Sequence, residues 1–319
     1  MDPTTDPKLV RIERYYHRLY HQLDPAVLRQ DAEGWPGQHD APVEDQDRCD
    51  RSDCRFLDYY SVQGLRNALE LYGFLGKIRA LGLGEPALSI HRHRDGYDIF
   101  RIRCRNASHP VVELVAMVAP LAPETNRFVD AGERRFLQVK WLRMQNAQAV
   151  VQPGRPLLPG QDFPGLGLGR EMMVLLQLIC TRLRLDGVVE LPERLHNAVL
   201  YFRRFRFLDP EMQGMVTAIL RDTRQHALFE LAWGVELGRL LDRTTGKALR
   251  WIATEQILPR TGPVLAHFES VGYRRRAEEA MHKHGFSLDA GDLARDLTPC
   301  GDPGAAAARS STSFRSKIK

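Results

Sequence analysis

The 319-residue chain is predicted to adopt an α/β fold, and three features of the sequence indicate this class. A glycine-rich loop leads directly into a segment with apolar residues at helical spacing, from Leu168 to Leu183. An Asp95-Gly96 pair separates two strand-like segments, as in a two-residue β-hairpin. Short apolar segments typical of buried strands lie on both sides of the glycine-rich loop. Helices and strands therefore alternate along the chain.

The N-terminal part is predicted to contain one helix, a long loop and two shorter helices. Residues 8–23 carry apolar side chains on one helical face, whereas residues 24–57 are polar and contain several glycines and prolines. Ser61 is placed to cap the next helix, which Gly73 interrupts and Gly82 ends.

Five strands are expected in the middle of the chain. The Asp95-Gly96 hairpin joins the first two, and a Pro/Gly-rich loop separates the fourth from a long helix that precedes the fifth. The predicted strands are Leu88–His93, Phe100–Cys104, Val111–Val118, Phe136–Met144 and Gly187–Leu191.

The C-terminal part is predicted to be mainly helical. A helix begins at Asp209-Pro210, a second spans Leu228–Leu241, and a last one spans Pro263–His284. Residues Leu249–Leu258 are predicted to form a strand between the last two helices.

Four parts of the chain follow from these assignments. They are an N-terminal helix with a polar loop (1–57), an α/β domain (58–207), a helical C-terminal extension packed on it (208–287), and a disordered tail (288–319). The tail is assigned to disorder because it lacks sustained apolar periodicity.

Composition places the chain among soluble globular proteins. Hydrophobic residues make up 43% and charged residues 27%, and the net charge is +5. This charge suits an anionic ligand, but it is spread along the sequence, so a nucleic-acid partner is unlikely on this evidence. No apolar run is long enough to span a membrane. Composition does not predict the oligomeric state.

The location and the cysteines are interpreted together. The opening MDPTTDPKLV lacks the apolar core of a signal peptide, so we expect a cytoplasmic protein whose five cysteines are free thiols. His39 lies near Cys49 and Cys54, but zinc sites usually have a tighter cysteine pair and a second pair elsewhere. No metal site is therefore predicted.

The segment QDFPGLGLGREMM, from Gln161 to Met173, is the strongest candidate for a binding site. Glycines at alternate positions, Gly165, Gly167 and Gly169, precede the predicted helix. Glycines allow an anion to approach the unpaired N–H groups and the positive end of a helix. The segment thus indicates a phosphate or pyrophosphate site, or else a connection that packs the helix tightly against a strand.

Two common phosphate motifs are excluded by spacing. A dinucleotide fingerprint needs a glycine at the sixth position, where Arg170 stands here, and a strand directly before it. A phosphate-binding loop of the Walker type needs Gly-Lys followed by Ser or Thr, which this segment lacks.

The segment resembles the acyl-CoA-binding loop of the GNAT superfamily, the acyl-CoA-dependent N-acyltransferases. In that family, (Gln/Arg)-x-x-Gly-x-(Gly/Ala) enters a long helix, and Pro164–Gly169 followed by Arg170–Met173 occupies this position. The resemblance continues through the strand at Gly187–Leu191 and the segment Arg194–Phe207, and covers about residues 136–207. It implies a mixed, mostly antiparallel sheet flanked by helices. The residues after Phe207 go beyond a minimal domain of this kind and add the helical C-terminal extension.

The resemblance also implies a function and a cofactor site. The function is transfer of an acyl group, such as acetyl, from acyl-CoA to a small-molecule or peptide amine. The acyl-CoA is expected to bind along the loop and at the end of the preceding strand, at Gly165, Leu166, Gly167, Leu168, Gly169, Arg170, Leu142 and Met144.

Four residues are candidates for acid–base chemistry. Glu190 and Glu113 lie on predicted strands, where burial would raise the pKa of a carboxyl group toward the working range. His196 has a side chain whose usual pKa suits proton transfer at neutral pH. Tyr201 is the phenol nearest to the position of a family tyrosine that protonates the departing thiolate. Each is also compatible with a purely structural role.

Two departures from the family pattern support an alternative function. Pro164 stands where the family has Gln or Arg, and proline has no N–H to donate to a phosphate. Phe202 stands at the position of the family tyrosine. The alternative is a catalytically inactive GNAT-like protein that binds CoA or acts as a scaffold.

Overall fold

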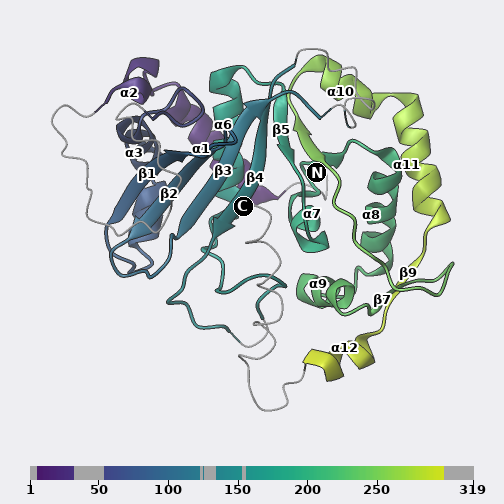
Figure 1. Cartoon of the computed structure of the whole chain (residues 1–319). Coiled ribbons are helices and arrows are strands. Elements are labelled where there is room, and N and C mark those ends of the chain that lie inside the picture. Colours follow the sequence, from purple (N-terminus) through teal and green to yellow (C-terminus); the bar gives the residue numbers. More distant parts are fainter. Residues whose placement is uncertain (1–5, 32–53, 123–124, 126–133, 153–155, 298–319) are drawn as a thin grey trace. The chain divides into compact units, whose positions relative to one another are not determined.

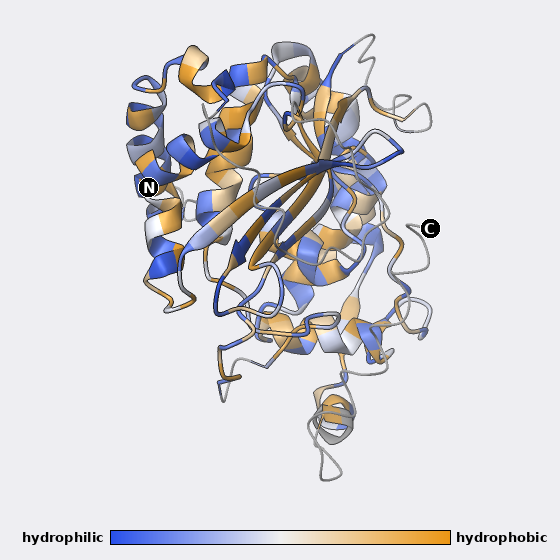
Figure 2. Cartoon of the chain, turned by 60° about the vertical axis from the view of Figure 1, so that its left-hand side comes forward, coloured by the Kyte–Doolittle hydropathy of each residue, from blue (hydrophilic) through white to orange (hydrophobic). Residues whose placement is uncertain are grey.

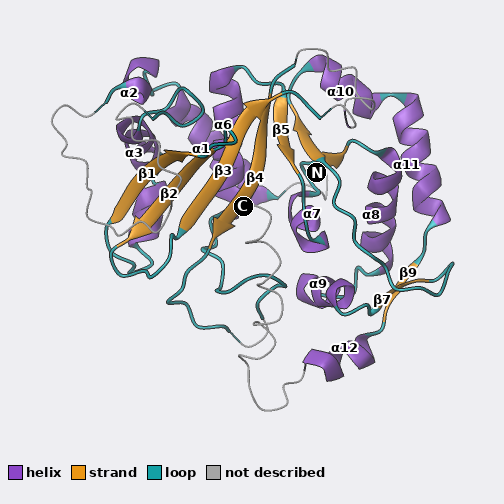
Figure 3. Ribbon diagram, in the orientation of Figure 1, coloured by secondary structure: helices purple, strands orange, loops and turns teal. Residues whose placement is uncertain are grey.

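The computed structural model describes residues 6–31, 54–122, 125, 134–152 and 156–297. The chain divides into two compact units: unit 1 contains residues 1–120, 135–149 and 165–188, and unit 2 contains residues 121–134, 150–164 and 189–319. Each unit combines helices with strands (Figure 3), so the predicted α/β class is confirmed.

Four antiparallel strands form the sheet of unit 1, in the order β1-β2-β3-β4 (Figure 1). Their bounds are Pro86–Arg92, Asp98–Cys104, Val112–Ala119 and Phe136–Met144. Gly96 adopts φ +83° in the β1–β2 hairpin, a conformation that favours glycine, so a turn at Asp95-Gly96 is confirmed. The predicted two-residue loop is wrong, because the turn is longer and Gly96 N donates to the carbonyl oxygen of His93 at 2.9 Å. The strands are coloured mainly as hydrophobic in Figure 2.

The helices of unit 1 begin where the sequence supplies capping side chains. Asp6 accepts a hydrogen bond from Lys8 N at 3.0 Å, and Ser61 Oγ accepts one from Gly64 N at 2.9 Å, as predicted for Ser61. Helix α6 packs against α1 and β4. The helices are α1 Pro7–Tyr20, α2 Pro25–Arg29, α3 Val62–Leu71, α4 Phe74–Arg79 and α6 Gly169–Leu183. Helix α2 lies in the segment that was predicted to be a loop.

Unit 2 is mainly helical, with two short antiparallel strand pairs. Strand β6 pairs with β8, and β7 pairs with β9. These strands are Arg206–Phe207, Gln256–Pro259, Leu240–Asp242 and Phe286–Leu288. The helices are α7 Leu195–Tyr201, α8 Pro210–Asp222, α9 Leu228–Glu236, α10 Gly262–Glu269, α11 Val271–Lys283 and α12 Ala290–Leu297. Strand β5, Gly187–Glu190, contains the division between the units.

The core of unit 2 explains why the units divide near residue 188 and not at 207. Leu195 of α7 and Phe207 of β6 belong to the same buried cluster as Ile219 of α8. A boundary at 207 would cut through this cluster. Helices α8 and α11 also approach closely at Gly214, where an added Cβ would lie 2.2 Å from the carbonyl oxygen of Ala277.

Three C-terminal predictions were wrong about where an element ends. The predicted strand 249–258 is reduced to Gln256–Pro259. The helix predicted over 228–241 ends at Glu236, before Gly238 at φ +69°. The chain then forms β7. The predicted helix 263–284 is two helices, because Ser270 has extended backbone and its hydroxyl caps α11 by accepting from Tyr273 N at 3.2 Å.

The predicted disordered tail also begins too early. Residues Ala290–Leu297 form α12, and Leu293 is only 2% exposed. The helix contacts α9 of unit 2, and Asp292 pairs with Arg239 at 3.0 Å. Residues 298–319 lie outside the described part of the chain.

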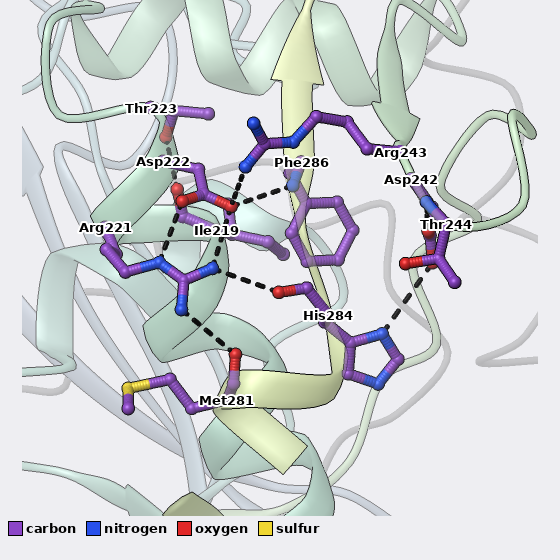
Figure 4. Close-up of polar contacts among 10 residues, drawn as sticks. All are labelled: Ile219, Arg221, Asp222, Thr223, Asp242, Arg243, Thr244, Met281, His284 and Phe286. Carbon is purple, nitrogen blue, oxygen red and sulfur yellow. Dashed lines mark hydrogen bonds and ion pairs between the residues drawn. The ribbon is translucent and has the colours of Figure 1, made fainter. Parts of the chain in front are cut away.

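A network of charged groups joins the end of α8 to β7 and β9 (Figure 4). Asp222 accepts hydrogen bonds from Arg221 Nε at 2.8 Å, Arg243 at 3.0 Å and Phe286 N at 2.8 Å. The neighbouring Arg221 guanidinium is the main cause that lowers the pKa of Asp222. Arg221 also donates to the carbonyl oxygens of Met281 at 3.1 Å and His284 at 3.0 Å. The network has a structural role, since its groups satisfy one another.

Candidate anion site at the start of helix α6

The glycine loop, Gly165–Gly169, belongs to unit 1 and is attached to the end of β4. Gly165 forms an isolated antiparallel bridge with Gln145, and Leu166 N donates to the carbonyl oxygen of Met144 at 3.2 Å. Leu166 and Leu168 are buried, at 6% and 7% exposed. The two leucines anchor the loop, and Gly167 lies between them.

The space around the glycines distinguishes the two interpretations of the loop. A Cβ added at Gly167 or Gly169 would meet no atom within 4 Å, whereas one added at Gly64 would lie 2.1 Å from Leu28 O. Close packing thus requires glycine at position 64, but it does not require glycine at positions 167 and 169. Gly167 has φ +74°, so the turn itself favours glycine. Tight helix packing therefore does not account for these two glycines.

The first turn of α6 has backbone N–H groups that find no acceptor among the described residues. Its N-cap residue, Leu168, makes no side-chain capping bond, and the first internal hydrogen bond runs from Met172 N to Leu168 O at 3.0 Å. Among the described residues, no acceptor is bonded to the N–H groups of Gly169, Arg170 and Glu171. These donors and the positive end of a 15-residue helix form an environment that favours an anion.

The side chains beside the loop are already paired. Arg170 Nε lies 2.6 Å from Asp6 Oδ2, and this contact is the main cause that lowers the pKa of Asp6. Glu171 is buried and pairs with Lys77. Two cations and two carboxylates thus offset one another here. An anion would be held chiefly by backbone N–H groups, unless Arg170 exchanges Asp6 for the ligand.

Asp6 and Lys77 were not identified from the sequence as part of this region. Asp6 is 164 residues away from Arg170 along the chain. The only local signal at Asp6 is the Asp-Pro pair that begins a helix, which predicts a cap and says nothing of a distant arginine.

Glu113, one of the predicted catalytic residues, lies near the loop in unit 1. It accepts from Arg101 Nε at 2.7 Å and from Arg143 at 3.4 Å. Both arginines are its cross-strand partners, on β2 and β4. Arg143 directly precedes Met144, which holds the glycine loop. This geometry makes Glu113 part of a cross-strand ion-pair ladder that ends beside the loop. Leu142 faces Leu114 in the same β3–β4 pairing.

Glu190 and Tyr201 both belong to unit 2. One carboxylate oxygen of Glu190 is buried and has no hydrogen-bond partner among the described residues. Burial raises the pKa of Glu190 to about 8, as the sequence led us to expect for a buried strand carboxyl group. Burial and the nearby Glu190 charge raise the pKa of Tyr201 above its usual value. At neutral pH the carboxyl group mostly holds its proton, and the phenol holds its own.

His196 differs from the expectation for a residue that exchanges protons at neutral pH. It lies on α7 in unit 2 and is 4% exposed. Burial, with a smaller contribution from Arg194, lowers the pKa of His196 to about 4. The imidazole is therefore neutral near pH 7 and does not titrate there.

The structure thus gathers the predicted residues into two groups. The glycine loop, Arg170, Leu142, Met144 and Glu113 belong to unit 1, and Glu190, His196 and Tyr201 belong to unit 2. Groups of His, Cys, Asp and Glu suited to a metal ion are not found among the described residues, and His39 and Cys49 lie outside them. In the described part of the chain, every helix is too short or too polar to cross a bilayer.

Comparison with models of known protein families and with curated proteins gives no match. The roles of the candidate residues therefore rest on the chain's own sequence and geometry.

Proposed function

We propose that the chain is an acyl-CoA-dependent N-acyltransferase, which transfers an acyl group such as acetyl from a coenzyme A thioester to an amine. One observation carries the proposal. The glycine loop is held at the end of β4, is open at Gly167 and Gly169, and precedes a first helical turn whose N–H groups have no acceptor among the described residues. These features suit a phosphate group.

The choice of coenzyme A among pyrophosphate ligands rests on the sequence. The spacing of the glycines excludes the dinucleotide and Walker patterns, and it resembles the GNAT acyl-CoA loop. The acyl-CoA would lie at Gly165–Arg170 and along the end of β4, at Leu142 and Met144. As co-substrate, it supplies the thioester that an amine attacks.

The acceptor chemistry requires a base, a stabilised carbonyl oxygen and a proton for the departing thiolate. Of the four candidates, Glu190 has the pKa best suited to proton transfer, because a value of about 8 leaves both forms populated near neutral pH. Glu113 is less suited to act as a base, since two arginines hold it in ion pairs. His196 is suited only as a neutral hydrogen-bonding group, and Tyr201 as a protonated phenol.

A second candidate function is a CoA-binding protein without acyltransferase activity. Pro164 offers no N–H to a phosphate, and Phe202 offers no phenol at the position where the family resemblance places one. The pairing of Arg170 with Asp6 also occupies the cation nearest the loop. Of these features, Phe202 bears on catalysis, whereas Pro164 and the Arg170–Asp6 pair bear on the strength of phosphate binding.

Binding and turnover measured on the same preparation separate the two functions. Calorimetry with CoA and with desulfo-CoA tests the loop, and release of free thiol from acetyl-CoA with a panel of amines tests catalysis. Binding with turnover supports the acyltransferase, binding without turnover supports the second candidate, and the absence of binding overturns both.

The variant Gly167→Asp places a carboxylate where the anion is expected, and should abolish CoA binding. Gly96→Asp is a matched control, because Gly96 is also an open glycine of unit 1 with positive φ, at +83°. If both variants lose CoA equally, or neither does, the glycine loop is not the site.

A further inference from the structure

A second candidate ligand site lies inside unit 1, away from the glycine loop. The structure contains a cavity of about 60 Å³. This is several times the space that one water molecule needs. Met172, Leu175 and Ile179 of α6 line one wall, and these residues follow one another at helical spacing.

Most of the remaining wall, away from Arg182, is apolar and aromatic. Side chains of α3, including Ala68 and Leu65, face the cavity, together with Phe100 and Leu114 of the sheet. Water gains little from such a lining, because it needs several polar partners that these side chains do not offer. This part of the cavity is therefore suited to an apolar group.

Arg182, near the C-terminal end of α6, is the cationic residue in the lining. Its guanidinium lies over the ring of Tyr20, with Cζ 4.2 Å from the ring centroid. One terminal nitrogen donates to the carbonyl oxygens of Tyr20 at 3.3 Å and Leu23 at 3.2 Å. Among the described residues, no carboxylate forms an ion pair with Arg182, and its other N–H groups have no acceptor there.

Phenol groups lie near the same cation. Tyr60 and Tyr72 line the cavity, and burial raises the pKa of both phenols well above the usual value while the Arg182 charge opposes this shift. The phenols are thus protonated at neutral pH. The wall around Arg182 combines a partly desolvated cation with hydroxyl groups, which together suit a carboxylate.

We propose that this cavity binds a small amphiphilic monocarboxylate, such as a medium-chain fatty acid. Its apolar tail lies against α6 and α3, and its carboxylate pairs with Arg182. The ligand supplies what the described chain does not, an anion for a half-buried guanidinium and apolar atoms for an apolar cavity. This site is independent of the proposed acyltransferase function.

Two ligands with the same apolar tail and different head groups distinguish the contribution of the carboxylate from that of the tail. Calorimetry and thermal shift are measured on the full chain with octanoate and with octan-1-ol. We expect octanoate to bind at least tenfold more tightly than octan-1-ol, as a charge-assisted pair requires. Equal affinities, or no binding of either ligand, would overturn the proposal.

Variants identify the residues involved. Arg182→Gln should remove the preference for octanoate without abolishing the binding of octan-1-ol, and Arg14→Gln, on the exposed surface of α1, should leave both affinities unchanged. Ala68→Leu fills the cavity and should weaken both ligands, and it keeps the test valid if Arg182→Gln fails to fold. A preference for octanoate that survives Arg182→Gln, or tail binding that survives Ala68→Leu, refutes the assignment.

The glycine loop provides a check that the two sites differ. Gly167→Asp should abolish CoA binding and leave octanoate binding unchanged. Loss of both ligands would show that the octanoate site is not separate from the loop.

Discussion

Replacing Gly169 with alanine tests whether the start of α6 is open for a ligand. Gly169 is the first residue of the helix and is not among the residues with positive φ, and an added Cβ meets no atom within 4 Å. Alanine should therefore fit without strain. Because alanine has fewer conformations than glycine in the unfolded chain, the variant should be more stable by about 0.4–1 kcal/mol.

The same methyl group should weaken the binding of an anion. It projects from the helix start, beside N–H groups that have no acceptor in the described chain. Losing one hydrogen bond to a charged phosphate costs about 1.5–3 kcal/mol, which is roughly a tenfold to hundredfold increase in the Kd for CoA. A gain in stability together with a loss of binding is the expected signature of an open site.

Two further variants complete the measurement. Gly167→Ala introduces a side chain at φ +74° and should cost about 1–2 kcal/mol in stability through backbone strain. Gly76→Ala, at an exposed and open position inside α4, should share the stability gain of Gly169→Ala without altering CoA binding.

Urea unfolding and calorimetry provide the two readouts. If Gly169→Ala lowers stability, the helix start is packed and the geometric argument is wrong. If it raises stability and CoA still binds as it does to the unaltered chain, the loop is open but is not the CoA site.

Three other predictions concern unit 2. Gly214→Ala should lower stability by about 2–3 kcal/mol in urea unfolding, because its Cβ would lie 2.2 Å from Ala277 O between α8 and α11; a change near zero would contradict the close packing. Asp222→Asn should lower stability by about 1–2 kcal/mol at pH 7, since it removes a charged acceptor whose partners are partly exposed. Because the pKa of Asp222 is lowered on folding, this loss should be present above about pH 4 and vanish as the pH falls below it, and a pH-independent difference would refute the assignment. Glu190→Gln should be increasingly more stable than the unaltered chain as pH rises from about 4 to about 8, because a pKa raised to about 8 makes the folded state hold a proton that the unfolded state has lost; equal stability across that range would show that Glu190 is not buried as described.

Much of the local structure could be predicted because its causes lie within a few residues. Asp95-Gly96 marks the turn of a hairpin, Ser61 caps the helix that follows it, and Phe136–Met144 is a strand with the predicted bounds. The errors at 263–284 and 288–297 arose where one or two residues decided the outcome. Ser270 interrupts an otherwise helical pattern, and buried Leu293 and the Asp292–Arg239 pair hold a helix that is too short to form alone.

The candidate site was predictable in part for the same reason. The alternation of glycine and leucine from Gly165 to Gly169 indicated a loop that exposes its backbone at the start of a helix, and the two buried leucines show how the alternation works. The pKa values of the acid–base candidates were harder to predict from the sequence. His196 and Glu190 lie six residues apart in the sequence, yet burial moves their pKa values in opposite directions.

The sequence by itself determined the α/β class, most of the helices and strands, and the position of the glycine loop, since these follow from residue spacing and capping over short distances. Only the tertiary structure decided that Arg170 pairs with Asp6, that Glu113 lies between two arginines, and that Arg182 lies at the edge of an apolar cavity. The physical reason is that burial, ion pairing and cavity shape depend on which distant segments pack together, and no pattern within a few residues carries that information.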